Sequence, residues 1–169
     1  GHAWELTVDY ATDPEHDAIL ANAEFTADDE HSYDVFSAAN ISLASTNSVD
    51  RGLRYGEEGK FHLVARNPDA YTAETQNELL VDENGDALSV AMAIAAESGF
   101  DWATVGAAGS ERLNALYTEG ELPDPIESVD GENIVLIGRL GTGETAEETV
   151  ALGFARRADT AAALGEADG

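Results

Sequence analysis

The side chains that could perform chemistry do not form a recognised catalytic pattern. None of the four histidines belongs to a His-x-x-x-His or Glu-x-x-His pair of the kind that holds a metal ion (His2, His16, His31 and His62). The serines examined for nucleophilic chemistry lack the turn of a nucleophile elbow (Ser42, Ser45, Ser48 and Ser110). The chain has no cysteine, which excludes thiol nucleophiles, disulfides and zinc–thiolate sites. We therefore predict no catalytic, no cofactor-binding and no metal-binding residues here.

Carboxylate pairs give no further information about catalysis. Glycoside hydrolysis uses two carboxylates on opposite sides of the scissile bond. With 34 Asp and Glu residues, some pair always satisfies that spacing. Aldose epimerisation would instead need a histidine and a carboxylate that converge in a cleft, and His62 is the candidate histidine. His62 is predicted on the polar face of a strand, where a surface role is the simpler interpretation.

Two glycine- or aspartate-containing motifs imitate ligand sites. Asp82-x-Asn84-x-Asp86 resembles the start of a calcium loop, but Ala87 and Ala93 stand where the loop needs Gly and Glu. Asn84-Gly85 is typical of a β-hairpin, and we favour the hairpin over a calcium loop.

The segment 141–146 has the spacing of a dinucleotide fingerprint. The alternating residues that follow it predict a strand rather than the required helix, so no cofactor is expected.

The positioning elements are mostly predicted strands. Apolar and polar residues alternate in many short segments separated by turn signals, the pattern of an antiparallel sandwich or barrel. These segments are 4–10, 16–26, 33–43, 61–66, 88–94 and 150–154, with a continuous apolar run at 134–137 that predicts a strand buried on both faces. Short helices are predicted at 110–116 and 155–164. We expect one all-β domain over residues 1–165 and a frayed tail at 166–169.

The charge restricts the partners. The chain has 34 acidic and 8 basic residues, which gives a net charge of −26, and Lys60 is the only lysine. Such a chain repels nucleic acid and anionic membrane surfaces. It contains no apolar run of membrane-spanning length and no signal-peptide pattern. Dispersed acids with almost no lysine predict a halophilic protein, because concentrated salt screens the self-repulsion. Either the cytoplasm of a salt-accumulating organism or an extracellular location fits.

Several segments, taken in order, resemble the N-terminal domain of glycoside hydrolase family 15, the glucoamylases and glucodextranases. In 4–14 a strand leads into a Thr-Asp-Pro turn, and 17–25 resembles the strand that follows. The resemblance continues through 62–66, 87–96, 98–116, 133–136 and 151–155, with Glu166 near its end. It implies an antiparallel super-β-sandwich of the galactose-mutarotase-like kind.

The resemblance also implies a division of labour. In the family this domain precedes an (α/α)6 barrel that carries both catalytic glutamates, and nothing in this chain matches the barrel. No catalytic residue is therefore transferred. The family domain begins earlier, so we expect that its first strands are missing upstream of Gly1. Sheet edges left exposed in this way would need another chain to cover them.

Three functions follow from these patterns. The first is a non-catalytic domain of a glucoamylase-like parent that releases glucose from α-glucosidic bonds, with one apolar face docked on the barrel. The second is a free-standing carbohydrate-binding module, which needs coplanar exposed aromatics such as Trp102, Tyr117 and Tyr71. The third is a self-contained epimerase built around His62. Trp4 is expected in the core because of its alternation.

Overall fold

Ten strands and one short helix account for the part of the chain described by the computed structural model, residues 4–28, 30–43, 49–57, 59–67 and 90–156. They are β1 (Trp4–Thr12), β2 (Ala18–Ala27), β3 (Tyr33–Ile41), β4 (Asp50–Glu57), β5 (Lys60–Arg66), β6 (Val90–Ala96), β7 (Ala103–Ala107), α1 (Glu111–Glu119), β8 (Ser128–Gly131), β9 (Ile134–Gly143) and β10 (Thr145–Arg156). No helix among the described residues is long and apolar enough to cross a membrane.

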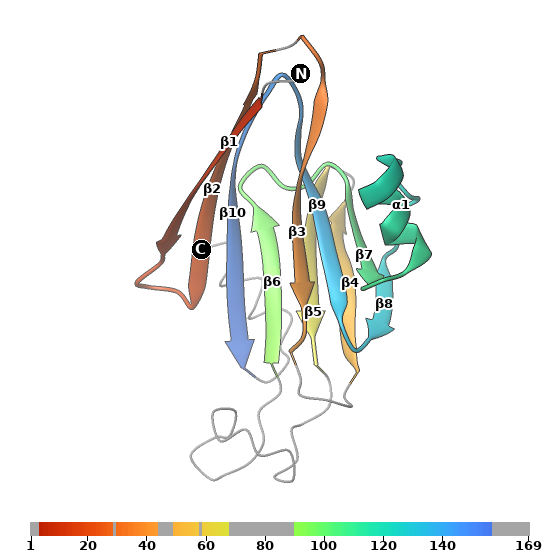
Figure 1. Ribbon diagram of the computed structural model, residues 1–169. Coiled ribbons are helices and arrows are strands. Elements are labelled where there is room, and N and C mark those ends of the chain that lie inside the picture. The colour runs from red at the N-terminus through yellow and green to blue at the C-terminus, as the bar shows by residue number, and fades with distance from the viewer. Residues whose placement is uncertain (1–3, 29, 44–48, 58, 68–89, 157–169) are drawn as a thin grey trace, which may run out of the picture.

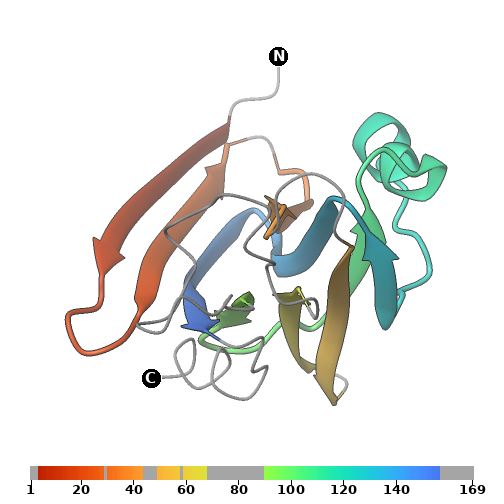
Figure 2. The same cartoon turned by 90° about the horizontal axis from the view of Figure 1, so that it is seen from below.

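The strands form two sheets of unequal size that pack face to face. The large sheet has seven strands in the order β1-β2-β10-β6-β5-β4-β8, and the small sheet has three in the order β3-β9-β7. Neighbouring strands run antiparallel in both sheets. Figures 1 and 2 show the small sheet lying over only part of the large one. The predicted all-β antiparallel sandwich is confirmed.

The core fills the space between the small sheet and the middle of the large sheet. Alternate residues of β5, β6 and β9 meet there, among them Leu63, Ile94 and Leu136, each at most 1% exposed. β9 is also buried on its outer side, because Leu113 of α1 packs on Val135 and Ile137. The prediction that the 134–137 run is buried on both faces is confirmed.

Close packing explains two glycines in the small sheet. A Cβ at Gly106 would lie 2.8 Å from a methyl carbon of Leu113, and one at Gly138 would lie 2.5 Å from the ring of Phe100. Both distances are shorter than any real Cβ contact, so these positions give α1 and Phe100 the room to approach the sheet. Glycine at these positions therefore serves packing rather than ligand binding.

The predicted helix at 110–116 is confirmed as α1. Ser110 occupies its N-cap position with extended backbone, and Gly120 ends it in the left-handed conformation, with φ of 68° and its N–H bonded to the Leu116 carbonyl. The helix predicted at 155–164 is wrong at its start, because β10 continues through Ala155 and Arg156. The remainder of that helix and the Asn84-Gly85 hairpin lie outside the described residues.

Three strands of the sandwich were not predicted from the sequence, namely β4, β7 and β8.

The first residue of β4, Asp50, is fully buried and accepts two hydrogen bonds of 2.8 Å, from the amide N–H of Leu43 and from the side-chain nitrogen of Asn67. A buried carboxylate with both oxygens bonded is a satisfied structural group. Asp50 therefore ties the start of β4 to two neighbouring segments.

Candidate functional site

Among the described residues, no strand lies over the inner face of β1. Trp4, Leu6 and Tyr10 share this face, since they pair with the inward-facing residues of β2, yet they are 58%, 46% and 75% exposed. The small sheet ends at β3, while β1 and β2 continue the large sheet beyond it (Figure 2). The prediction that Trp4 lies in the core is therefore wrong. Its alternation identified the correct face, but no strand of the described structure covers that face.

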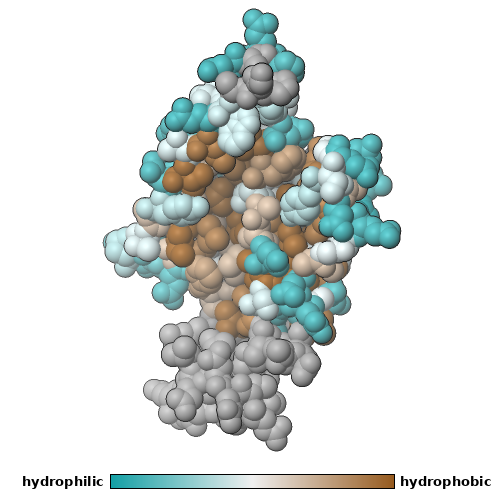
Figure 3. All heavy atoms as spheres, in the orientation of Figure 1, coloured by the Kyte–Doolittle hydropathy of each residue, from teal (hydrophilic) through white to brown (hydrophobic). Residues whose placement is uncertain are grey.

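A groove follows this uncovered face. It has a volume of about 260 Å³ and lies between β1, β2 and β10 on one side and β3 on the other. The described residues that line it are mostly apolar and none is charged; Leu6, Val8, Val35, Leu140 and Leu152 are among them. Figure 3 shows hydrophobic surface gathered over this region of the molecule. We call this feature the β3 groove, and it is an exposed apolar patch of the kind that marks an interaction site.

A second hollow lies on the opposite side of the small sheet, beside α1. It has a volume of about 470 Å³ and is lined by Tyr33, Asp34, Phe36, Tyr117 and Leu122 among others. Tyr117 is 61% exposed, so its ring is available to a partner. We call this feature the α1 hollow.

The other aromatic residues proposed for sugar binding are placed less favourably. Trp102 is half-buried and packs edge-on against Phe36, with ring centres 5.8 Å apart and planes at 76°. Tyr71 lies outside the described residues. The structure therefore leaves Tyr117 as the exposed candidate.

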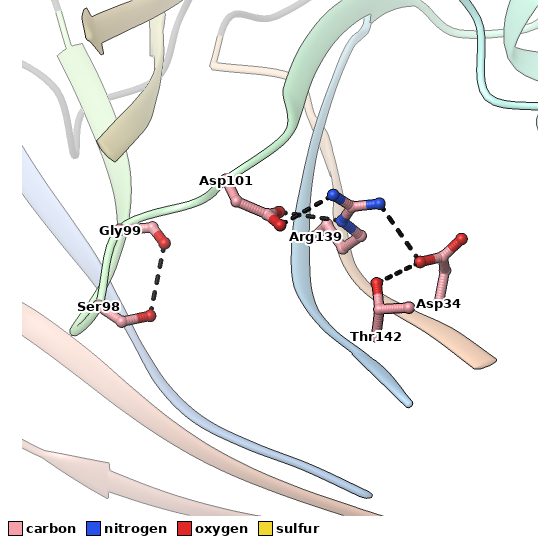
Figure 4. A network of polar contacts seen from close by, with 6 residues as sticks. All are labelled: Asp34, Ser98, Gly99, Asp101, Arg139 and Thr142. Carbon is pink, nitrogen blue, oxygen red and sulfur yellow. Dashed lines mark hydrogen bonds and ion pairs between the residues drawn. The ribbon is translucent and has the colours of Figure 1, made fainter. Parts of the chain in front are cut away.

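A network of polar side chains (Figure 4) includes Asp34, one of the residues that line the α1 hollow. The Nε and Nη2 atoms of Arg139 donate to the two carboxylate oxygens of Asp101 at 2.9 and 2.8 Å, and Nη1 donates to Oδ1 of Asp34 at 3.3 Å. The hydroxyl of Thr142 donates to the same oxygen of Asp34. The hydrogen bonds from Arg139 hold the pKa of Asp101 below its usual range, and Asp101 raises the pKa of Arg139. The network joins β3, β9 and the segment before β7, which is a structural role.

His62 lines a third hollow, on the outer face of the large sheet. The volume is about 370 Å³, and Lys60, Glu97 and Ser98 also line it. An imidazole and a carboxylate therefore share one hollow, as an epimerase would require, but no hydrogen bond between His62 and Glu97 is observed. Among the described residues, no three His, Asp or Glu side chains gather closely enough to hold a metal ion.

The remaining predicted sites are structural or lie outside the described chain. Nδ1 of His16 is 3.0 Å from Oδ2 of Asp13, in the turn between β1 and β2. The backbone N–H of Glu15 and the His16 ring together lower the pKa of Asp13. The glycines of the dinucleotide-like segment end β9 and lead directly into β10, so the helix of a nucleotide site is absent there. His2 and the calcium-like loop at 82–86 lie outside the described residues.

These observations define a class: an antiparallel β-sandwich domain, with apolar side chains exposed on β1 among the described residues. The sequence then identifies the family, because residues 1–168 match the family described as glucodextranase, domain N. The chain belongs to that family. Among curated proteins, none has a sequence that matches this chain.

A solved structure has the same fold. It is a bacterial glucoamylase complexed with acarbose, which superimposes with a TM-score of 0.70 at 16% sequence identity. The match covers 97% of this chain and 21% of the glucoamylase chain, so this chain spans about a fifth of the length of that enzyme. At this identity the comparison supports the fold alone.

Proposed function

We propose that this chain is the non-catalytic N-terminal domain of a family 15 glycoside hydrolase, whose parent cleaves α-glucosidic bonds and releases glucose. The observation that carries the proposal is the family match over residues 1–168. The described side chains agree with it, since the carboxylates of Asp101 and Asp34 are both hydrogen-bonded to Arg139 in a structural network. In this reading, the chemistry belongs to an (α/α)6 barrel elsewhere in the parent.

The role of the domain would be to brace that barrel. The α1 hollow supports this role, because Tyr117 and Leu122 are exposed beside a concavity large enough to take a projecting side chain or loop. Interfaces between domains of one chain commonly bury such partly polar surfaces. Replacement of Tyr117 with Ala would then lower the thermal stability of the parent more than that of the isolated chain.

The first experiment measures glucose release from maltotetraose by the purified chain in multimolar KCl. Circular dichroism on the same sample checks that the chain is folded. The proposal predicts a folded chain with no turnover and glucose release by the parent. Turnover by the folded chain alone would place a catalytic pair within these residues and reject the proposal.

A second candidate function is carbohydrate binding at the α1 hollow. It is favoured by the exposed ring of Tyr117 close to Asp34, whose Oδ2 accepts no hydrogen bond from the described residues. An aromatic face and a free carboxylate oxygen are suited to a sugar ring and its hydroxyl groups. Calorimetric titration with maltoheptaose tests this function. Binding that Tyr117→Ala abolishes would favour it over the brace, and Tyr10→Ala on β1 is the matched control.

A further inference from the structure

The α1 hollow combines an acidic side chain with aromatic rings. Asp34 of β3 is the one charged side chain among the described residues that line it, and Tyr33, Phe36 and Tyr117 contribute the rings. The face of an aromatic ring attracts a cation, and an ionised carboxylate forms strong hydrogen bonds with a charged donor. A carboxylate beside aromatic rings is therefore suited to an organic cation.

A bulge in β9 fixes the direction of the Asp34 carboxylate. The register of β3 with β9 shifts at Leu140, an extra residue of β9 that has no partner on β3. A regular strand would place Arg139 and Thr142 on opposite faces, and the bulge brings both to the face that carries Asp34. Both donate to Oδ1 of Asp34, and Figure 4 shows the other oxygen turned away from them. The carboxylate is thus held in place while Oδ2 stays available to a ligand.

The charges around the α1 hollow favour a cation as well. Two carboxylates, those of Asp101 and Asp34, share the single guanidinium group of Arg139, so the network retains one negative charge. Tyr117 of α1 and Gly120 at its C-cap also line the hollow. The end of a helix at its C-terminus carries a partial negative charge, because its last carbonyl groups have no intrahelical partners. The last turn of α1, all of which is described, contains no basic residue that would offset this charge.

We propose that the α1 hollow binds the guanidinium group of an arginine side chain. A guanidinium group is planar and weakly hydrated, so it can stack on an aromatic ring and donate to Oδ2 of Asp34 at the same time. The volume of about 470 Å³ admits such a side chain. The inference deepens the brace role proposed above and rests on it for the source of the arginine, which is the barrel of the parent. Composition agrees with arginine rather than lysine, since Lys60 is the only lysine among the eight basic residues of this chain.

Titration of the isolated chain with N-acetyl-arginine amide tests the site. The control ligand is N-acetyl-citrulline amide, which has nearly the same shape and no charge. NMR chemical shifts are followed at the lowest KCl concentration at which circular dichroism shows a folded chain, because salt screens the attraction. The arginine compound should shift the signals of Asp34 and Tyr117 with a dissociation constant of about 1 mM. The citrulline compound should bind more weakly by about tenfold or more.

Two variants of the hollow should weaken binding of the arginine compound. Asp34→Asn removes the negative charge and Tyr117→Ala removes an aromatic ring, and each should raise the dissociation constant by about fivefold or more. Asp9→Asn and Tyr10→Ala on β1 are the matched controls and should leave it unchanged. Tyr117 is 61% exposed, so its replacement keeps the test decisive even if Asp34→Asn does not fold.

The parent protein tests the source of the arginine. If a side chain of the barrel occupies the α1 hollow, the parent should not bind the arginine compound. Asp34→Asn should then lower the Tm of the parent more than that of the isolated chain. Equal binding of the compound by the parent and the isolated chain would show that the hollow is open in the parent and would overturn the barrel as the source.

Four results would overturn the site itself. The first is the absence of saturable shifts in the folded isolated chain at tens of millimolar arginine compound. The second is equal binding of the citrulline compound, and the third is unchanged binding by both Asp34→Asn and Tyr117→Ala. The fourth is tighter binding of maltoheptaose at the same signals, which would assign the hollow to carbohydrate. Glucose release is measured separately, so failure of the site and failure of the proposed function are distinguishable.

Discussion

Two regions of the sandwich contain strands with inward-facing apolar residues, but these residues lie in opposite environments. In the closed half, where β4, β5 and β6 face β7 and β9, inward-facing residues such as Leu63 and Leu136 are at most 1% exposed. In the open half, formed by β1 and β2, the inward-facing Leu6 is 46% exposed. Alternation in the sequence therefore identifies which face of a strand is apolar. Whether that face is buried depends on a strand from elsewhere in the fold.

This difference sets where the stability of the domain resides. Burial of a leucine side chain contributes about 1.5–3 kcal/mol, so the closed half supplies most of the hydrophobic stabilisation. The open half is held mainly by backbone pairing of β1 with β2 and of β2 with β10. Such a region resembles a binding surface that a partner would order and protect.

The largest effect is expected from salt, because it acts on the whole chain. Lowering KCl from 3 M to 0.1 M lengthens the screening distance to about 10 Å and restores repulsion among the acidic residues. With a net charge of −26, we expect the free energy of unfolding to fall from a typical value of about 5–15 kcal/mol to near zero.

Hydrogen exchange across a KCl series measures this effect element by element. Amides of β1 and β2 should lose protection at a higher KCl concentration than those of β6 and β9. A constant free energy of unfolding between 3 M and 0.1 M KCl would reject the halophile interpretation. Simultaneous loss of protection everywhere would reject the division into two halves.

A matched pair of leucine truncations gives the next largest effect. Leu136→Ala removes a fully buried side chain and should lower the free energy of unfolding by about 2–5 kcal/mol. Leu6→Ala removes a half-exposed one and should lower it by less than about 1 kcal/mol. Urea denaturation at 3 M KCl provides both values. Equal losses would mean that the groove is already covered in solution.

Buried hydrogen bonds should show the same contrast. Asp50→Ala leaves the Leu43 N–H and the Asn67 side-chain nitrogen without their carboxylate acceptor, and we expect a loss of about 2 kcal/mol. Asp9→Ala, on the exposed outer face of β1, should change the free energy by less than about 0.5 kcal/mol. Thermal denaturation at 3 M KCl compares the two variants. A larger effect at Asp9 would contradict the structural role assigned to Asp50.

Much of the fold follows from local patterns, and most of the functional surface does not. The alternation of 4–10, the doubly buried run at 134–137 and the helix beginning at 111 were all predictable from sequence. β4 was not predictable, because charged and glycine residues interrupt any apolar alternation in its sequence. Its two buried residues are Asp50 and Gly52, and neither has an apolar side chain that would indicate burial.

The candidate site depends on contacts between distant residues. Arg139 bonds to Asp101 and Asp34, which lie 38 and 105 positions before it in the chain. No spacing in the sequence predicts these contacts. The β3 groove depends on the absence of a strand beyond β3 in the described structure. The alternation around Trp4 could not show this absence, and it therefore led to the wrong prediction of a core position for Trp4. Burial of a face by strands that are distant in the sequence is the part of the fold that local sequence patterns do not predict.

The smallest effect is expected at two carboxyl groups with lowered pKa, one in each half. Arg139 lowers the pKa of Asp101, while the Glu15 amide and His16 lower that of Asp13 in the β1–β2 turn. A lowered pKa in the folded state stabilises it above the unfolded value of about 3.9, and this contribution is lost as the pH falls through the folded value. Above pH 5, Asp101→Asn should cost less than about 1 kcal/mol, because the pair is partly exposed.

The two variants should differ in which strands they affect. Asp101→Asn should raise hydrogen exchange in β3 and β9, which the Arg139 network joins, whereas Asp13→Asn should affect only β1 and β2. Once the pH falls below the lowered pKa of its carboxyl group, each variant should match the unsubstituted chain, because that group is then protonated in both the folded and the unfolded state. Urea denaturation between pH 2.5 and 6 measures the convergence. A difference that persists at low pH would assign the effect to packing rather than to charge, and exchange in β9 caused by Asp13→Asn would show that the halves are coupled.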